Sequence, residues 1–314
     1  MNNDEWIDEY GVTYSADKKR LIKGNPNLTE YQIFEGCESV KEYAFAHFTY
    51  LTSISIPNSI TVIERYAFMS CWELKEVHLV NGIKTIGHDA FSYSKSESFY
   101  IPDSVSKLVN PFIGCYNLQK IVCDNPYFQS IGGILFSTDL KTIVAFPAGR
   151  KEAEYYIPNG VVTIGKHAFA SCKNLKNIHI PDSVKIIEDD AFSMCEFQSI
   201  IIPDSVTLIG NGAFSLCKSL ACITIGKNVI SIGCCNFFLS DYKLSEIYCK
   251  NQIPPDTPQS PIPSDILPFT IDNDYYLDDN CLQFVDKTTC KLYVPKGSKE
   301  AYQKAWGFEN IIEE

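Results

Sequence analysis

The stretch AFASCKNLKNIHIPDSVKIIEDD at residues 168–190 is followed directly by AFSMCEFQSIIIPDSV at residues 191–206. Each segment opens on Ala-Phe and has a cysteine four positions later. Related openings begin at positions 44, 67, 90, 111, 213 and 236. Within the two sets of starts, 44 to 111 and 168 to 236, successive units lie 21 to 23 residues apart. Self-similarity at such a period is the signature of a solenoid.

Within one unit the apolar residues alternate as a half-buried strand requires. Ile178 and Ile180 flank His179, and Pro181 then begins a turn, because proline fixes φ and has no N–H for a ladder. Phe169 is expected to fill the interior. Coils that stack about 4.8 Å apart align each position in a column, so ten or eleven coils would form a rod of roughly 50 Å. No single coil buries its own face, which is why an array is needed.

A larger module is used twice along the chain. The string GVTYSAD at residues 11–17 is matched by GILFSTD at residues 133–139, and each leads through an irregular turn into four regular units. We therefore predict one elongated solenoid domain with six parts: an N-terminal irregular double-length turn or cap (1–43), a first array of four repeats (44–132), a second irregular double-length turn (133–167), a second array of four repeats (168–252), a loop insertion (253–291) and a C-terminal cap (292–314).

The pattern A-F-x-x-C-x-x-L-x-x-I-x-I-P-x-S-V resembles the BspA-like (TpLRR-type) leucine-rich repeat family over about residues 11–249. The resemblance implies a β-rich leucine-rich repeat solenoid, a right-handed superhelix of 22–23-residue coils with short strands, little helix and a C-terminal cap. The end of the chain is similar to the family's closing cap. There we expect a last strand over 292–294 and a short helix with Ser298 as its N-cap. Three aromatic residues of this segment are expected to cover the end of the core: Tyr302, Trp306 and Phe308.

Composition and charge exclude several classes of partner. The 314 residues are 45% hydrophobic, with 38 acidic against 27 basic residues and a net charge of −11. An acidic surface repels phosphate backbones and anionic lipid, so we expect no nucleic-acid partner. No apolar run approaches the ~20 residues of a spanning helix, so we expect no membrane insertion. The first residues lack the features of a signal peptide, which predicts a cytoplasmic protein if Met1 is the native start.

The cysteines form a column rather than a disulfide framework. Thirteen is an odd number, and no C-x-x-C pair of the kind that zinc sites favour is present. We interpret the column as a small buried apolar residue repeated with the coil, the alternative being a metal or redox ladder. Its members follow the unit starts by four positions: Cys71, Cys115, Cys172, Cys195 and Cys217. We predict no cofactor.

The insertion leaves two further alternatives open. Cys281 and Cys290 would form one disulfide if the protein is exported. The acidic run of Asp272, Asp274 and Asp278–Asp279 offers the oxygen ligands that calcium prefers, but it lacks the glycine and closing glutamate of an EF-hand loop. We interpret this run as a solvated loop.

The sequence carries no motif of a known catalytic site. There is no H-E-x-x-H, nucleophile elbow, P-loop or G-x-G-x-x-G. His78 and His179 share a column, but about four coils separate them, too far to share a proton. Because the repeat explains the residues completely, we predict that the protein is not an enzyme.

Two columns of side chains point outward from the strands, toward an expected concave face. The first column is Ser53, Glu76, Ser98, Lys120, Asn177, Ser199, Cys222 and Glu246. The second is Ser55, His78, Tyr100, Val122, His179, Ile201, Thr224 and Tyr248. Aromatic side chains carry much of the energy of interfaces, although strand surfaces favour Tyr, Thr and Ile in any case. The predicted protein-binding residues are Glu76, His78, Tyr100, Lys120, Asn177, His179, Ile201 and Tyr248.

These observations predict a non-catalytic repeat scaffold that binds protein through the concave strand face. The family resemblance implies a bacterial surface or secreted protein that adheres to host extracellular matrix or to cell-surface macromolecules, and so an extracellular location. Two alternatives stay open. One is a cytoplasmic protein–protein scaffold, which the absent signal and the unpaired cysteines favour, and the other is a carbohydrate-binding module, which a tyrosine-lined face would suit. The residues predict neither the ligand nor an oligomeric state.

Overall fold

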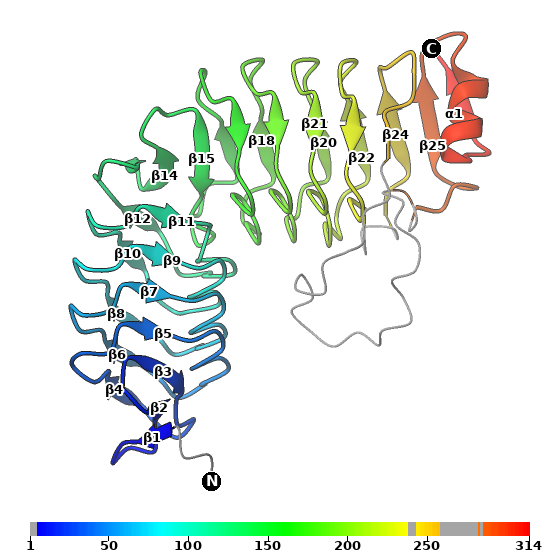
Figure 1. Ribbon diagram of the computed structural model, residues 1–314. Coiled ribbons are helices and arrows are strands. Elements are labelled where there is room, and N and C mark those ends of the chain that lie inside the picture. The colour runs from blue at the N-terminus through cyan, green and yellow to red at the C-terminus, as the bar shows by residue number, and fades with distance from the viewer. Residues whose placement is uncertain (1–4, 238–242, 258–281, 283–284) are drawn as a thin grey trace. The chain divides into compact units, whose positions relative to one another are not determined.

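The computed structural model describes residues 5–237, 243–257, 282 and 285–314. Over these residues the chain is built from short strands and a single helix, α1 (Lys299–Trp306). The strands stack coil upon coil, which confirms the predicted β-rich leucine-rich repeat solenoid (Figure 1). By its internal contacts the chain divides into two compact units, Met1–Arg150 and Lys151–Glu314. Within the described residues, no helix has the length and hydrophobicity to cross a membrane.

In unit 1 (Met1–Arg150) each regular coil has a long strand of three residues and a short strand of two. The long strands are β4 (Glu30–Gln32), β6 (Ser53–Ser55), β8 (Glu76–His78), β10 (Ser98–Tyr100) and β12 (Lys120–Val122). The short strands are β5 (Ser39–Val40), β7 (Val62–Ile63), β9 (Thr85–Ile86) and β11 (Lys107–Leu108). Neighbouring coils pair in parallel, so that Glu30 lies beside Ser53 and Ser53 beside Glu76. This register places equivalent repeat positions in columns, as the sequence period predicts.

Unit 2 (Lys151–Glu314) follows the same plan and ends in the cap. Its long strands are β16 (Glu154–Tyr156), β18 (Asn177–His179), β20 (Ser199–Ile201), β22 (Cys222–Ile225), β24 (Glu246–Cys249), β25 (Lys291–Val294) and β26 (Ile311–Glu313). Its short strands are β17 (Thr163–Ile164), β19 (Ile186–Ile187), β21 (Leu208–Ile209) and β23 (Ser231–Ile232). Strands β20, β22, β24, β25 and β26 form one parallel sheet in that order.

The phenylalanine of each Ala-Phe opening lies in the core and stacks on the same residue of the next coil. In unit 1 the ring centroids of Phe45 and Phe68 are 5.1 Å apart, and those of Phe68 and Phe91 are 5.3 Å apart. In unit 2, Phe192 stacks on Phe169 at 5.3 Å and on Phe214 at 5.6 Å. These phenylalanines are at most 1% exposed. The core is therefore a continuous column of aromatic rings within each unit.

The corner that carries Ala-Phe turns through residues in the left-handed region. In the unit that starts at Ala67, Tyr66 has φ 59° and Ser70 has φ 59°. The same two repeat positions are left-handed in the unit that starts at Ala191, where Asp190 has φ 52° and Met194 has φ 58°. A left-handed backbone at a residue other than glycine costs roughly 1 kcal/mol, and coil-to-coil hydrogen bonds hold it here, such as Phe68 N–H to the Ala90 carbonyl at 2.8 Å.

Two three-stranded antiparallel meanders, each ending in a hairpin, interrupt the parallel coils near the two copies of the duplicated string. The first comprises β1 (Glu5–Ile7), β2 (Thr13–Ser15) and β3 (Arg20–Lys23). The second comprises β13 (Phe128–Ile131), β14 (Ile134–Ser137) and β15 (Thr142–Ala145). The turns between the last two strands have the same hydrogen bonds. Ser15 Oγ donates to Asp17 Oδ1 and Ser137 Oγ donates to Asp139 Oδ1, both at 2.6 Å.

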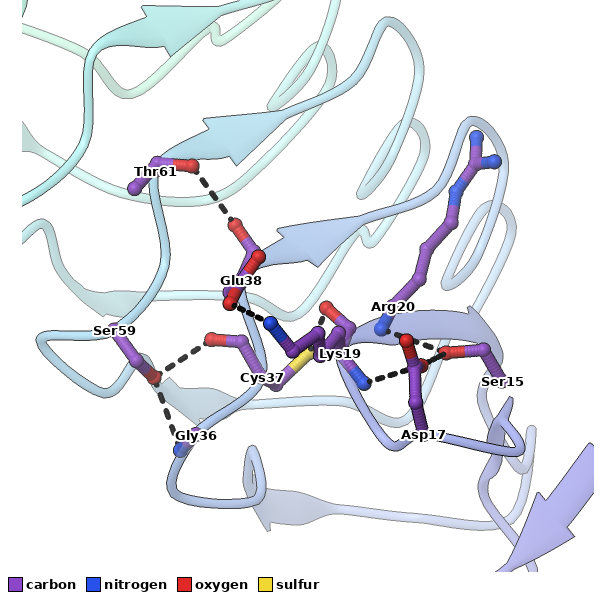
Figure 2. A network of polar contacts seen from close by, with 9 residues as sticks. All are labelled: Ser15, Asp17, Lys19, Arg20, Gly36, Cys37, Glu38, Ser59 and Thr61. Carbon is purple, nitrogen blue, oxygen red and sulfur yellow. Dashed lines mark hydrogen bonds and ion pairs between the residues drawn. The ribbon is translucent and has the colours of Figure 1, made fainter.

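The first hairpin turn is tied to the coil that follows it (Figure 2). Lys19 Nζ forms an ion pair with Glu38 at 2.8 Å, and the Cys37 thiol donates to the Lys19 carbonyl at 3.5 Å. One coil further on, Ser59 Oγ donates to the Cys37 carbonyl at 2.6 Å and Thr61 Oγ1 donates to the Glu38 carbonyl at 3.2 Å. The Lys19 and Glu38 carbonyls also accept backbone N–H groups, from Glu38 and Thr61 respectively, so these side-chain hydrogen bonds add to backbone bonds between the coils.

The C-terminal cap confirms the expected strand, its covering aromatic residues and Ser298 as the N-cap residue of α1. Strand β25 includes 292–294, and Tyr302, Trp306 and Phe308 are at most 2% exposed. Ser298 occupies the N-cap position without a side-chain cap hydrogen bond, because its hydroxyl donates to the Pro295 carbonyl at 2.5 Å. Glu313 Oε1 accepts from the N–H groups of Gly297 and Lys299, which flank Ser298, both at 3.0 Å.

Candidate functional site

The predicted binding residues lie on the outer side of the long strands. In the middle of each long strand a side chain such as Phe99 or Ile200 points into the core, so the residues on either side point outward. Seven of the eight predicted residues are exposed: Glu76, His78, Tyr100, Lys120, Asn177, His179 and Ile201. The eighth, Tyr248, is half-buried. Four of the eight belong to unit 1 and four to unit 2.

An aromatic stack lies at the start of the outer column of unit 2, by which we mean the outward column that contains His179, Ile201 and Tyr248. The rings of Tyr156 and His179 are nearly parallel, with centroids 4.0 Å apart. Strands β16 and β18 place these residues directly opposite each other. His179 Nε2 lies 2.7 Å from Glu154 Oε1, which fixes the imidazole ring from the neighbouring strand. Tyr156 is 64% exposed, so this stack is open to solvent.

A second aromatic stack lies at the other end of the same column. Tyr248 of β24 and Tyr293 of β25 have centroids 4.2 Å apart and planes 4° apart. The Tyr248 hydroxyl donates to Glu246 at 3.2 Å, and Lys291 Nζ lies 3.8 Å from the same carboxylate. Burial raises the pKa of Tyr248, and the neighbouring Tyr293 hydroxyl and Glu246 carboxylate raise it further.

Ile201 lies in the column between these two stacks. It is 64% exposed and pairs with Thr224 of the next strand. An exposed branched aliphatic side chain between aromatic groups, with ion-paired carboxylates beside them, matches the apolar centre and polar rim of a protein interface. The corresponding column of unit 1 has two large exposed apolar residues, Tyr100 and Val122.

Sequence reasoning missed three members of this face. Glu154 and Tyr156 lie in the irregular segment before the second array, where the Ala-Phe opening is absent, and Tyr293 lies beyond the insertion. The signal for Tyr156 was the following Ile157-Pro158, which repeats the Ile-Pro that ends the regular long strands. Parallel pairing of β16 with β18 and of β24 with β25 brings all three residues into the predicted columns.

The cysteine column is buried in the core, as the small-apolar interpretation predicts. Its five members are at most 1% exposed. The thiols also donate to carbonyls of the preceding coil: Cys71 Sγ to Phe45 O at 3.1 Å and Cys195 Sγ to Phe169 O at 3.1 Å. A buried thiol with such a partner is a structural residue, and burial raises its pKa.

Alkaline pH is therefore expected to destabilise the fold. Burial raises the pKa values of Cys71, Cys115 and Cys217 to about 12, 11 and 12, whereas an unfolded thiol titrates near ~8.5. The stabilisation is complete below the unfolded pKa and is lost as pH rises from about 9 toward 11, by ~1.4 kcal/mol for each thiol and pH unit. Urea unfolding between pH 7 and 10.5 measures this. A Cys71→Ala/Cys217→Ala variant should show a shallower pH dependence, and an unchanged slope would contradict the assignment.

The structure brings together no cluster of metal-binding side chains in the part of the chain that it describes. His78 lies in unit 1 and His179 in unit 2, each on the outer side of its strand. The acidic run at Asp272–Asp279 and the thiol of Cys281 lie outside the described residues, so the calcium and disulfide alternatives stay predictions.

Comparison with known proteins gives one family and several structures. A family model for the BspA type leucine-rich repeat region matches residues 38–156 and 145–254. Solved structures with TM-scores of 0.50 to 0.62 are 21 to 23% identical in sequence to this chain, and this structural likeness shows a common fold. A search of curated proteins finds no match.

Three of these structures come from bacteria. A leucine-rich repeat protein from Eubacterium ventriosum has a TM-score of 0.62 and 21% identity, and the match covers 74% of this chain and 72% of that one. The pneumococcal vaccine antigen PcpA has a TM-score of 0.61 and 23% identity, over 98% and 82% of the two chains. A leucine-rich repeat protein from Bacteroides ovatus has a TM-score of 0.50 and 22% identity, over 81% and 71%.

Proposed function

Because the chain belongs to the BspA-type leucine-rich repeat family, we propose that it is a non-catalytic bacterial surface or secreted protein that binds other proteins. The outer side of its long strands is the proposed binding face. The family supports the scaffold, and PcpA, which shares the fold, is a pneumococcal vaccine antigen. The proposed partners are proteins of the host extracellular matrix or of neighbouring cell surfaces.

One observation carries the choice of face. The outer column of unit 2 presents Ile201 between the Tyr156–His179 stack and the Tyr248–Tyr293 stack. Stacked rings have restricted rotamers, so they lose little conformational entropy when a partner covers them. Tyrosine and large apolar side chains of this kind dominate interface energies.

The test compares two exposed residues of the same repeat. Ile201→Ala removes an apolar side chain from the proposed face, and Leu208→Ala removes one from short strand β21, where Leu208 is 43% exposed. We expect the Tyr156→Ala/Ile201→Ala variant to lose at least tenfold in affinity for immobilised basement-membrane extract, because both side chains belong to the face and are 64% exposed. Leu208→Ala should bind like the unmodified chain.

Two outcomes would contradict this proposal. Equal loss in the Leu208→Ala variant would place binding elsewhere on the protein. Failure of the unmodified chain to bind the extract, together with specific capture of a cytosolic bacterial protein, would favour the alternative of a cytoplasmic scaffold. A Tyr100→Ala/His179→Ala variant tests the predicted residues of both units in the same assay.

A further inference from the structure

A second group of exposed aromatic side chains lies on the turns that precede the long strands of unit 1. We call Trp72, Tyr93 and Tyr116 the aromatic row. The centroids of Trp72 and Tyr93 are 5.1 Å apart, and those of Tyr93 and Tyr116 are 6.3 Å apart. Trp72 is 45% and Tyr116 38% exposed, while Tyr93 is half-buried. The row thus crosses three successive coils, those of β8, β10 and β12.

The fold does not require aromatic residues at these positions. Trp72 and Tyr116 directly follow the column cysteines Cys71 and Cys115. In unit 2 the residues that follow the column cysteines are charged: Lys173, Glu196 and Lys218. The same turn is built in both units, so packing of the coil does not explain the aromatic row.

The centre of the row is held in place by the backbone. Tyr93 has φ 63°, and the equivalent Met194 of unit 2 has φ 58°, so the backbone of this turn is conserved between the units. The Tyr93 ring lies directly over Gly114, where an added Cβ would come within 2.4 Å of two ring carbons. Glycine in the next coil therefore leaves room for the ring, and the row is a preformed surface.

Ring orientation distinguishes this row from the strand face. The two stacks on the strand face have planes 6° and 4° apart, so their rings cover one another. In the aromatic row the planes of Trp72 and Tyr93 are 43° apart and those of Tyr93 and Tyr116 are 61° apart. Tilted rings cover one another less completely than parallel rings do. The exposed surface of Trp72 and Tyr116 therefore includes ring area on which a ligand can pack.

A line of polar side chains runs beside the row. Each residue of the row is followed, one or two positions later in the sequence, by a polar residue: Glu73, Lys95 or Asn117. Lys95 Nζ contacts both carboxylate oxygens of Glu73 at 2.9 and 3.0 Å, and Asn117 Nδ2 donates to the Lys95 carbonyl at 3.4 Å. The Glu73 and Lys95 side chains are 44% and 38% exposed. Acceptors and donors therefore lie on the same turns as the rings of the row.

We propose that the aromatic row binds a neutral glycan chain. The C–H faces of pyranose rings pack on open aromatic faces, and sugar hydroxyls both donate to a carboxylate and accept from an ammonium or amide group. A proline-rich peptide also packs on aromatic side chains, but its prolines lack the N–H groups that Glu73 would accept from. The glycan therefore matches the whole surface, the rings and the polar line together. This site is separate from the strand face.

The experiment compares the full chain with a variant in which two residues of the row are replaced by the residue type that unit 2 has at the equivalent positions. Trp72→Lys/Tyr116→Lys places at these turns the lysine that unit 2 has at Lys173 and Lys218, so the variant is expected to fold. The probes are cellohexaose, xylohexaose, mannohexaose and chitohexaose, measured by titration calorimetry and tryptophan fluorescence. Trp306 is 2% exposed and Trp6 is half-buried, so Trp72 dominates any quenching by a ligand at the row.

We expect at least one hexasaccharide to bind the unmodified chain, to change the tryptophan fluorescence and to bind the variant about tenfold or more weakly. Ile201→Ala, on the strand face, should bind it unchanged. Absence of binding by all four sugars would overturn the proposal, as would equal binding by the variant. Binding of a nonaproline peptide at the row, with no sugar bound, would assign the site to a peptide instead.

Discussion

Replacement of Phe192 by alanine is expected to lower the free energy of unfolding of unit 2 by about 3–5 kcal/mol. Phe192 is completely buried and lies between Phe169 and Phe214, so its removal leaves a cavity that interrupts the aromatic column. Coils in a solenoid depend on their nearest neighbours, and the loss should therefore be concentrated in β20 and β22. Urea unfolding followed by circular dichroism gives the size of the effect, and hydrogen exchange gives its position.

Phe192→Leu is the control for this change. It keeps most of the buried volume, so its cost should be clearly smaller than that of alanine. A loss below about 1 kcal/mol in Phe192→Ala would show that neighbouring coils collapse into the space, contrary to a column in which each ring supports the next.

Trp306→Ala is expected to have a similarly large effect, about 3–5 kcal/mol, and to cause association of the protein as well. Trp306 packs edge to face on Tyr302, and its Nε1–H donates to the Pro255 carbonyl at 3.4 Å. The Tyr302 hydroxyl in turn lies 3.0 Å from the Asn251 carbonyl. Loss of the indole would expose the apolar end of the core, which terminal caps of repeat proteins normally cover. Thermal unfolding and light scattering on a sizing column measure the two effects.

Trp306→Phe separates the two contributions of the indole. Phenylalanine keeps the apolar cover but loses the hydrogen bond to Pro255, so we expect a loss of only about 1 kcal/mol and a monomer-like elution. A Trp306→Ala protein that is as stable and as soluble as the unmodified chain would show that α1 does not close the solenoid.

The burial of the repeat positions could be predicted from the sequence because all residues of one column lie in the same environment within their coils. Phe169 and Cys195 recur with the coil, and burial of the phenylalanine and cysteine columns confirms those predictions. The long strands were placed correctly for the same reason. The assignment of the outward residues to binding and the division into six segments within one domain stay predictions.

Contacts between segments that are distant in the sequence could not be predicted from a local sequence pattern. The sequence around Ser298 correctly predicts the N-cap position, but it does not indicate that β26 brings the carboxylate of Glu313 to the N–H groups of Gly297 and Lys299. The Tyr248–Tyr293 stack joins strands on either side of the insertion, so no local spacing indicates it. The aromatic row was likewise missed, since Tyr93 occupies a different repeat position from Trp72 and Tyr116.

The two antiparallel hairpins also give the chain two places where folding can begin. Strands β2 and β3 are separated by residues 16–19, and β14 and β15 by residues 138–141. Hairpins of this kind form within about 1–10 μs, whereas contacts between parallel coils must first close a loop of a whole repeat. Each hairpin then offers a formed edge on which the next coil can assemble. We therefore expect that duplication of the module also gave the array a second site at which folding can begin.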